Sequence, residues 1–249
     1  MTNPPFRLKN APIVEAILDV ECDMPPKYSL TEMEVPATDL FKATYPKVRK
    51  KFLKEFTVQA HENTARAVNQ GLQSLHFIQP DGKQLVQVRS TGFSFNRLAP
   101  YGGFDDYLPE VERTWKEFVH LTKPVQIRLV RMRYINRLML PMAEQKVDLD
   151  YFLRIGPRLS DEKRLILSGF LHQNVVSEVG TDHRGVIVLT SQIAEGGKLP
   201  VIFDISVEAP SRESPSNKDY LLGKIVALRS LKNAIFKDTL TEKCLALFQ

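Results

Sequence analysis

The chain has 249 residues, of which 43% are hydrophobic and 25% are charged. Both values are ordinary for a folded protein, and the length suits one large domain or two domains of about 120 residues each. The 34 basic and 29 acidic residues leave a net charge of +5, which is a milder excess than the concentrated basic surface of a dedicated nucleic-acid-binding protein.

The sequence also bears on the compartment. Its two cysteines, Cys22 and Cys244, lie far apart and form no CxxC pair, so we expect reduced thiols in a cytoplasmic protein. Residues 1–10 lack the apolar core of a signal peptide, and no run approaches the ~18 apolar residues that a membrane span needs. We therefore expect neither export nor membrane insertion.

The first predicted element is a strand over 13–23, where apolar even positions alternate with mostly charged odd positions. A period of two is typical of a strand with one buried face. Apolar residues at helical spacing then predict a helix over 38–56, with a kink or turn at Pro46. The polar stretch 57–70 is predicted to be a loop or a short helix.

Three strands and a helix follow. Strands are predicted over 72–78 and 85–91, joined by the hairpin turn Pro-Asp-Gly-Lys at 80–83. A third strand is predicted over 93–98. Residues 104–121 carry their apolar side chains on one helical face, so we expect a helix there with its tryptophan in the core.

The pattern then restarts. Pro124 precedes a predicted strand over 125–140, just as Pro12 precedes the strand over 13–23. The further predicted elements are a short helical piece, three strands and a long amphipathic helix, over 149–155, 164–176, 185–193, 201–207 and 217–236.

This order of elements, a strand, a helix, about three strands and a helix, occurs twice. It predicts an α+β protein of two similar halves, 1–123 and 124–249, packed as one unit. We expect a mainly antiparallel sheet with helices on one face, and a saddle-like arrangement by analogy with the TATA-binding protein. The strand over 201–207 is a candidate edge strand through which two copies could form a homodimer.

The two strands that open the halves carry opposite charges at odd positions. The charged residues at these positions include Glu15, Asp19, Glu21, Arg131, Arg133 and Arg137. Antiparallel pairing of the strands would bring the acidic row against the basic row. Three interpretations stay open: a cross-strand ion-pair ladder that fixes the register, an arginine-lined groove for an anionic ligand or partner, and paired carboxylates for acid–base catalysis.

No sequence motif identifies an enzyme. GxGxxG, GxxxxGK[ST], GxSxG and HExxH are all absent, and the five histidines form no HxH or His/Cys pair. We therefore expect no cofactor and no metal ion, and we assign no catalytic residue.

Three segments together resemble a known family. They are Pro-Ile-Val-Glu-Ala-Ile-Leu-Asp-Val at 12–20, Arg-Tyr-Ile-Asn-Arg at 133–137, and Leu-Arg-Ser-Leu-Lys-Asn-Ala-Ile-Phe-Lys-Asp-Thr-Leu-Thr at 228–241. The chain thus resembles a sporadically distributed family of uncharacterised bacterial and archaeal proteins. The resemblance implies a prokaryotic protein with an accessory role, such as defence, toxin neutralisation or partner binding. It emphasises Glu15, Arg133, Tyr134, Asn136 and Arg137.

Taken together, the sequence favours a non-enzymatic binding protein whose partner is a protein. The candidate binding residues are Glu15, Asp19, Glu21, Arg131, Arg133, Tyr134, Asn136 and Arg137. One alternative is a nucleic-acid-binding protein that uses the arginine-bearing sheet face, with Phe93, Phe95 and Tyr134 stacking on bases. A second alternative is an enzyme that acts on an anionic small molecule, with Glu15 or Asp19 as the base.

Overall fold

A computed structural model describes residues 8–59, 64–144, 146–158 and 167–249, and within 53–59 and 64–70 it describes only the backbone. Up to residue 123 the elements are β1 (Ile13–Asp23), α1 (Glu34–Phe41), β2 (Lys47–Gln59), β3 (Thr64–Ile78), β4 (Gln84–Arg89), β5 (Gly92–Leu98) and α2 (Phe104–Thr122). The later elements are β6 (Gln126–Pro141), α3 (Leu149–Phe152), β7 (Leu171–Ser177), β8 (Arg184–Ser191), β9 (Lys198–Glu213), α4 (Lys218–Thr239), α5 (Glu242–Leu245) and a 3-10 turn (Ala246–Phe248).

The described strands form one continuous sheet in the order β2-β3-β4-β5-β1-β6-β9-β8-β7, and each neighbouring pair is antiparallel. The α+β class predicted from the sequence is confirmed. The strands that open the two parts of the chain, β1 and β6, lie side by side at the centre of the sheet, as the prediction required. The remaining strands of each part lie on the outer side of its own opening strand.

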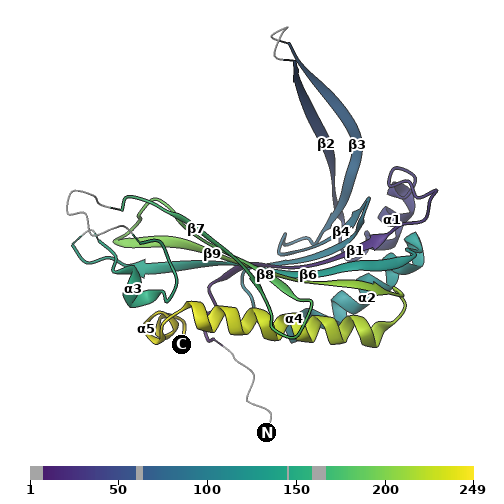
Figure 1. Cartoon of the computed structure of the whole chain (residues 1–249). Coiled ribbons are helices and arrows are strands. Elements are labelled where there is room, and N and C mark those ends of the chain that lie inside the picture. The colour runs from purple at the N-terminus through teal and green to yellow at the C-terminus, as the bar shows by residue number, and fades with distance from the viewer. Residues whose placement is uncertain (1–7, 60–63, 145, 159–166) are drawn as a thin grey trace.

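The helices cover one face of the sheet, which we call the helix face (Figure 1). Its buried residues on the three central strands include Ala16, Leu18, Val20, Val130, Met132, Tyr134, Leu138, Phe203, Ile205 and Val207. Phe93 of β5 packs on Trp115 of α2, with ring centroids 5.6 Å apart, and Phe203 stacks on Phe236 of α4 at 5.6 Å. Full burial of such a side chain stabilises the fold by about 1.5–3 kcal/mol. The opposite face is called the open face below.

The two long helices also contact one another, so that the buried residues of both parts of the chain belong to one core. Arg229 of α4 donates two hydrogen bonds to the Asp105 carboxylate at the start of α2, at 2.6 and 3.0 Å. The indole nitrogen of Trp115 donates to the carbonyl of Pro215 at 3.2 Å. Lys123, where the sequence suggested the boundary, ends α2 in a left-handed conformation with φ 48°.

The predicted helix over 38–56 is wrong in its second half, because α1 ends at Phe41 and β2 begins at Lys47. Pro46 has no N–H to continue a helix, and its ring disfavours helical conformation in the residue before it. The basic residues after it belong to strand β2. The stretch predicted as a loop or short helix, 57–70, instead belongs to β2 and β3, apart from residues 60–63, which lie outside the described residues.

The β2–β3 hairpin leaves the sheet and rises on the side opposite α4 (Figure 1). Only residues 74–78 of β3 pair with β4, so the rest of the hairpin has no third strand beside it among the described residues. Register shifts occur around Phe52, between Lys51 and Lys54. Such irregularities bend a strand and increase its twist, which accounts for the departure of the hairpin from the sheet near this point.

Two further strand predictions need correction. Residues 201–207 are not an edge strand, because β9 lies between β6 and β8, and a homodimer through that segment is therefore ruled out. Apolar and polar residues alternate along 201–207 because one side of β9 packs against the core and the other side lies on the polar open face. The strand predicted over 164–176 occurs as β7, Leu171–Ser177, while residues 164–166 lie outside the described residues.

The other predicted elements are confirmed to within a few residues, apart from two strands that are longer than predicted. The strand predicted over 72–78 begins at Thr64 as β3, and the strand predicted over 201–207 continues to Glu213 as β9. The turn at 80–83 joins the antiparallel strands β3 and β4. The helices predicted over 104–121 and 217–236 correspond to α2 and α4. Among the described helices, none combines the length and the apolar character that crossing a membrane requires.

Candidate functional site

One line of directly paired residues crosses every described strand on the open face. In spatial order from β2 to β7, the line consists of Arg49, His76, Gln87, Ser94, Asp19, Arg131, Glu208, Arg184 and Ser177. All nine side chains are polar, because side chains alternate between the two faces of a sheet and the other face is the core. The predicted site residues on β1 and β6 lie at the centre of this line.

The central arginines are held by carboxylates on both sides. Arg131 Nη2 lies 2.8 Å from Glu208 Oε2 on β9, and Arg131 Nη1 lies 3.6 Å from Glu21 Oε1 on β1. Arg133 donates from Nε and Nη2 to the Asp204 carboxylate, at 3.0 and 2.5 Å. This paired geometry raises the pKa of Arg133 above its usual value. The observed geometry is therefore an ion-pair ladder that spans β1, β6 and β9.

The acidic residues on β1 bind neighbouring polar side chains of β5. Glu15 accepts a hydrogen bond from Asn96 at 2.7 Å, and Asp19 accepts one from Ser94. Ser94 and Asn96 are 1% and 4% exposed, so these carboxylates satisfy polar groups that would otherwise be buried without partners. Asp19 also lies 3.4 Å from Arg89. Neither carboxylate lines the pocket beside Tyr101, the pocket beside Trp115 or the pocket beside His183.

The structure divides the predicted binding residues between two faces. Those on the open face are Glu15, Asp19, Glu21, Arg131, Arg133 and Arg137. Tyr134 and Asn136 instead lie on the helix face and are each 1% exposed. Asn136 donates to the carbonyls of Tyr134 and Phe203, at 3.3 and 2.9 Å. Grouping these two residues with the arginines was wrong, because they occupy even positions of β6.

The same alternation of side chains between the two faces places the aromatic residues predicted to stack on bases in the core. Phe93, Phe95 and Tyr134 all point into the core, and none is more than 1% exposed. Phe95 stacks on Tyr107 of α2, with ring centroids 5.7 Å apart. The open face therefore receives no contribution from these aromatic side chains.

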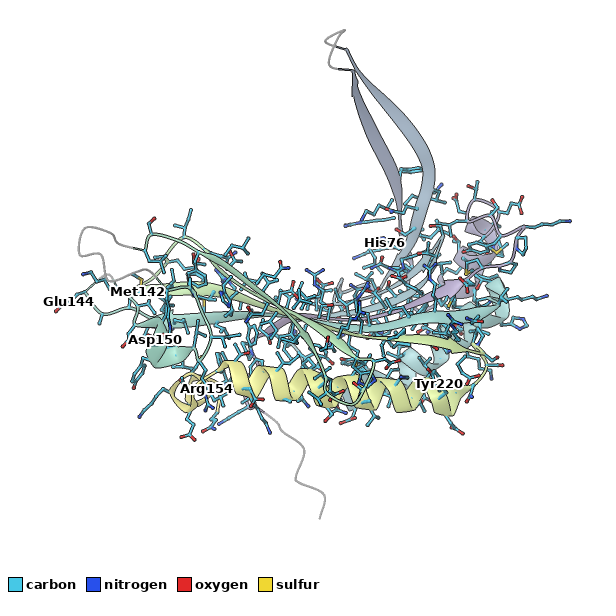
Figure 2. All side chains as sticks on the ribbon, in the orientation of Figure 1. His76, Met142, Glu144, Asp150, Arg154 and Tyr220 are labelled. Atoms are coloured by element: carbon cyan, nitrogen blue, oxygen red, sulfur yellow. The ribbon has the colours of Figure 1, made fainter. Side chains whose placement is uncertain are left out.

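One end of the open face is basic. Arg49 and Lys51 are exposed on β2, and among the side chains that the structure describes neither has an ion-pair partner. His76 lies beside them at the base of the hairpin (Figure 2). Burial lowers the pKa of His76, and the charges of Lys51 and Arg49 lower it further. The basic end therefore keeps its positive charge on the lysine and the arginine.

The other end of the open face is apolar. Leu171 and Val175 on β7 are 72% and 68% exposed. In the ladder with β8 they lie opposite Thr190 and Val186. The open face thus changes along the sheet from basic side chains on β2, through the ion-paired centre, to exposed aliphatic side chains on β7.

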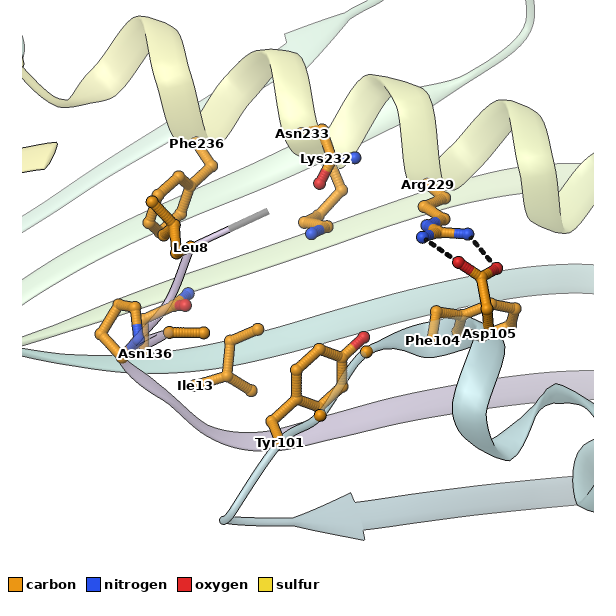
Figure 3. A pocket seen from close by; sticks show the side chains of 14 residues that line it. Leu8, Ile13, Tyr101, Phe104, Asp105, Asn136, Arg229, Lys232, Asn233 and Phe236 are labelled. Atoms are coloured by element: carbon orange, nitrogen blue, oxygen red, sulfur yellow. Dashed lines mark hydrogen bonds and ion pairs between the residues drawn. The ribbon is translucent and has the colours of Figure 1, made fainter. Parts of the chain in front are cut away.

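A pocket of about 100 Å³ lies on the helix face, between α4, the start of α2 and the segment that leads into β1 (Figure 3). Lys232 points from α4 into this pocket and is 9% exposed. Its Nζ atom lies 4.1 Å from the ring centre of Tyr134. Asn136 and Tyr101 also line the pocket. This pocket therefore adjoins Tyr134 and Asn136, the two predicted binding residues that lie on the helix face.

Burial, together with the nearby charge of Arg229, lowers the pKa of Lys232 to about 7. Sequence reasoning missed this residue because a lysine on an amphipathic helix is usually placed on the exposed side. The signal was present, since Lys232 follows Leu228 by four positions and Ile225 by seven, and so falls within the apolar stripe.

No family model matches the chain, and no curated protein matches it. The resemblance of segments 12–20, 133–137 and 228–241 to a sporadically distributed prokaryotic family thus stays a prediction. Within the described part of the chain, no three His, Cys, Asp or Glu side chains are grouped as metal ligands would be. The function must therefore be inferred from the two faces of the sheet.

Proposed function

We propose that this chain is a non-enzymatic binding protein that holds a protein partner on its open face. The observation that carries the proposal is the composition of this uncovered face along the sheet. It offers exposed basic side chains at β2, ion-paired arginines at its centre and exposed aliphatic side chains at β7. Protein interfaces combine apolar contacts with arginine in this way.

A protein partner fits this face better than a nucleic acid does. Binding to nucleic acid requires a row of cations that neutralise successive phosphates. At the centre of the open face Arg131 and Arg133 are already bound by carboxylates. A phosphate would have to displace these carboxylates, and the exposed aliphatic side chains of Leu171 and Val175 offer it no hydrogen-bond donor. In an accessory role such as toxin neutralisation, the open face would act by covering a surface of its protein partner.

The proposal is tested with two variants as baits in affinity capture. Leu171→Thr combined with Val175→Thr removes the apolar contacts but keeps residues that suit the strand, since threonine has high β-propensity. Val226→Asp is the matched control, because Val226 is 65% exposed on α4, which covers the other face. We expect a direct partner of the wild-type protein to be retained by the control and lost by the β7 variant.

The nucleic-acid alternative is measured in parallel by fluorescence anisotropy with single- and double-stranded oligonucleotides at low salt. The proposal predicts no binding to either oligonucleotide. Binding that weakens steeply as salt rises, together with a capture pattern that the β7 variant does not change, would overturn it in favour of nucleic acid.

A further inference from the structure

The pocket on the helix face contains a buried cation without a counter-ion. No hydrogen bond or ion pair joins Lys232 Nζ to any residue that the structure describes; its neighbours are the Tyr134 ring and the Arg229 charge. Buried ammonium groups in proteins are normally paired with an anion. The Tyr134 ring attracts the cation through its face, but it carries no net charge.

The acidic groups around the pocket are committed elsewhere. The carboxylate of Asp105 binds both terminal nitrogens of Arg229. Asp106, the next acidic residue of α2, is exposed and does not line the pocket. The charges of Asp105 and Arg229 therefore compensate one another, whereas the structure describes no anionic partner for Lys232.

The walls of the pocket have two chemical characters. Lys232, Tyr101 and the ion pair of Arg229 with Asp105 form one polar part of the lining. Leu8, Ile13 and Phe236 lie toward the other end, on the same side as Asn136 (Figure 3). We propose that the pocket binds a short-chain carboxylate, with the carboxylate on Lys232 Nζ and the hydrocarbon chain against these apolar side chains. Inorganic phosphate has the charge but no apolar part to place there.

The tyrosine hydroxyls provide a second donor for the carboxylate. Tyr101 Oη lies 3.0 Å from the hydroxyl of Tyr107 and 3.4 Å from that of Tyr134. When Tyr107 and Tyr134 both donate to the Tyr101 hydroxyl, the proton of Tyr101 is left to donate to a ligand. Tyr101 is the member of the three that lines the pocket.

The size of the pocket limits the ligand. A cavity of about 150 Å³ accommodates benzene, which has six heavy atoms, so a pocket of about 100 Å³ encloses about four heavy atoms of a short-chain carboxylate, and the remaining atoms extend into its open mouth. Butyrate is therefore a suitable probe. Butyramide is its matched control, because it has the same shape and number of heavy atoms but carries no charge.

The test measures the thermal unfolding midpoint as a function of butyrate concentration at constant ionic strength, with Trp115 fluorescence as the signal. A ligand that binds only the folded state stabilises it by RT ln(1 + [L]/Kd), so the midpoint rises with ligand concentration and the rise reports the affinity. We expect butyrate to raise the midpoint, and butyramide and inorganic phosphate to have little effect. Lys232→Met should weaken butyrate binding at least tenfold, while Lys224→Met, on the same helix and 3.6 Å from Asp182, should leave it unchanged.

The pH dependence of binding provides an independent readout. Because the carboxylate binds the protonated lysine, and the pKa of the unliganded lysine is about 7, affinity should fall about eightfold between pH 7.5 and 8.5. Tyr101→Phe removes the donor without touching the lysine, and we expect it to weaken binding several-fold at every pH. Equal stabilisation by butyrate and butyramide, or an unchanged affinity in Lys232→Met, would overturn the proposal. Because the pocket and the open face lie on opposite sides of the sheet, failure here leaves the proposed protein-binding function to its own test.

Discussion

Replacing Lys232 with methionine should change how the stability of the protein depends on pH. In the folded protein the pKa of this lysine is lowered from 10.5 to about 7, chiefly by burial. Between pH 7 and about pH 10.5 the unfolded chain therefore binds more protons at this residue than the folded chain does. The free energy of unfolding must then rise with pH across this window. Below pH 7 the lysine is charged in both states, and the cost of burying it is fully present.

The magnitude follows from the two pKa values. At about 1.36 kcal/mol for each pKa unit, burying the charged lysine costs about 5 kcal/mol at low pH. Between pH 7 and pH 9 the wild-type protein should regain about 2 kcal/mol of this amount. Methionine has a similar length and no charge, so Lys232→Met should be more stable than the wild type at pH 6. The difference between the two proteins should shrink by about 2 kcal/mol between pH 7 and pH 9.

The assay is urea unfolding followed by the fluorescence of Trp115, which is buried between α2 and the sheet. Burial also raises the pKa values of Cys22 and Cys244 to about 12, which lowers stability at alkaline pH. That effect is the same in both proteins and cancels in their difference. Lys224→Met serves as the control for loss of a lysine from α4. Parallel pH profiles for the wild type and Lys232→Met would refute the reasoning, because they would mean that Lys232 titrates alike in the folded and unfolded chains.

Gly92→Ala should cost about 2–4 kcal/mol in urea unfolding, because φ is +144° and the new Cβ would lie 2.1 Å from the carbonyl oxygen of Val20. Gly82→Ala is its control and should cost only about 1 kcal/mol, since φ is +72° with no atom within 4 Å; equal losses would contradict this account of Gly92. Arg133→Ala combined with Arg137→Ala should cost about 1 kcal/mol, or about 2–4 °C in the unfolding midpoint, because both ion pairs are partly exposed. A much larger loss would identify the ladder as a main source of stability.

The sequence predicted the centre of the fold well and its periphery poorly. In β1 and β6 one face is core and the other is charged, so an alternation with a period of two is clear. That alternation correctly separated Arg131 and Arg133 from Val130 and Met132. In β2 the alternation is blurred by basic residues at successive positions, such as Lys50 and Lys51, which also suit the exposed side of a helix. The choice between a helix and a strand over these residues is made only by the pairing of β2 with β3.

The candidate site shows the same contrast. The ladder between β1 and β6 follows from charge patterns within two strands, but its partners Asp204 and Glu208 come from β9, whose neighbours depend on the topology of the whole sheet. The pocket around Lys232 needs α4, the start of α2 and the segment before β1 to meet at one point. Contacts of this kind leave no periodic trace in the sequence.

The pair at the centre of the sheet has a consequence for how such a protein can be assembled. Asp19 and Arg131 lie directly opposite one another, and they stand at equal distances from Pro12 and Pro124 in the sequence. If either part of the chain associated with a copy of itself in the same way, two aspartates or two arginines would meet on the symmetry axis. Like charges directly opposite one another destabilise a strand pair. The charges of Asp19 and Arg131 thus disfavour pairing between two copies of the same part of the chain. They favour pairing between the two different parts of one chain.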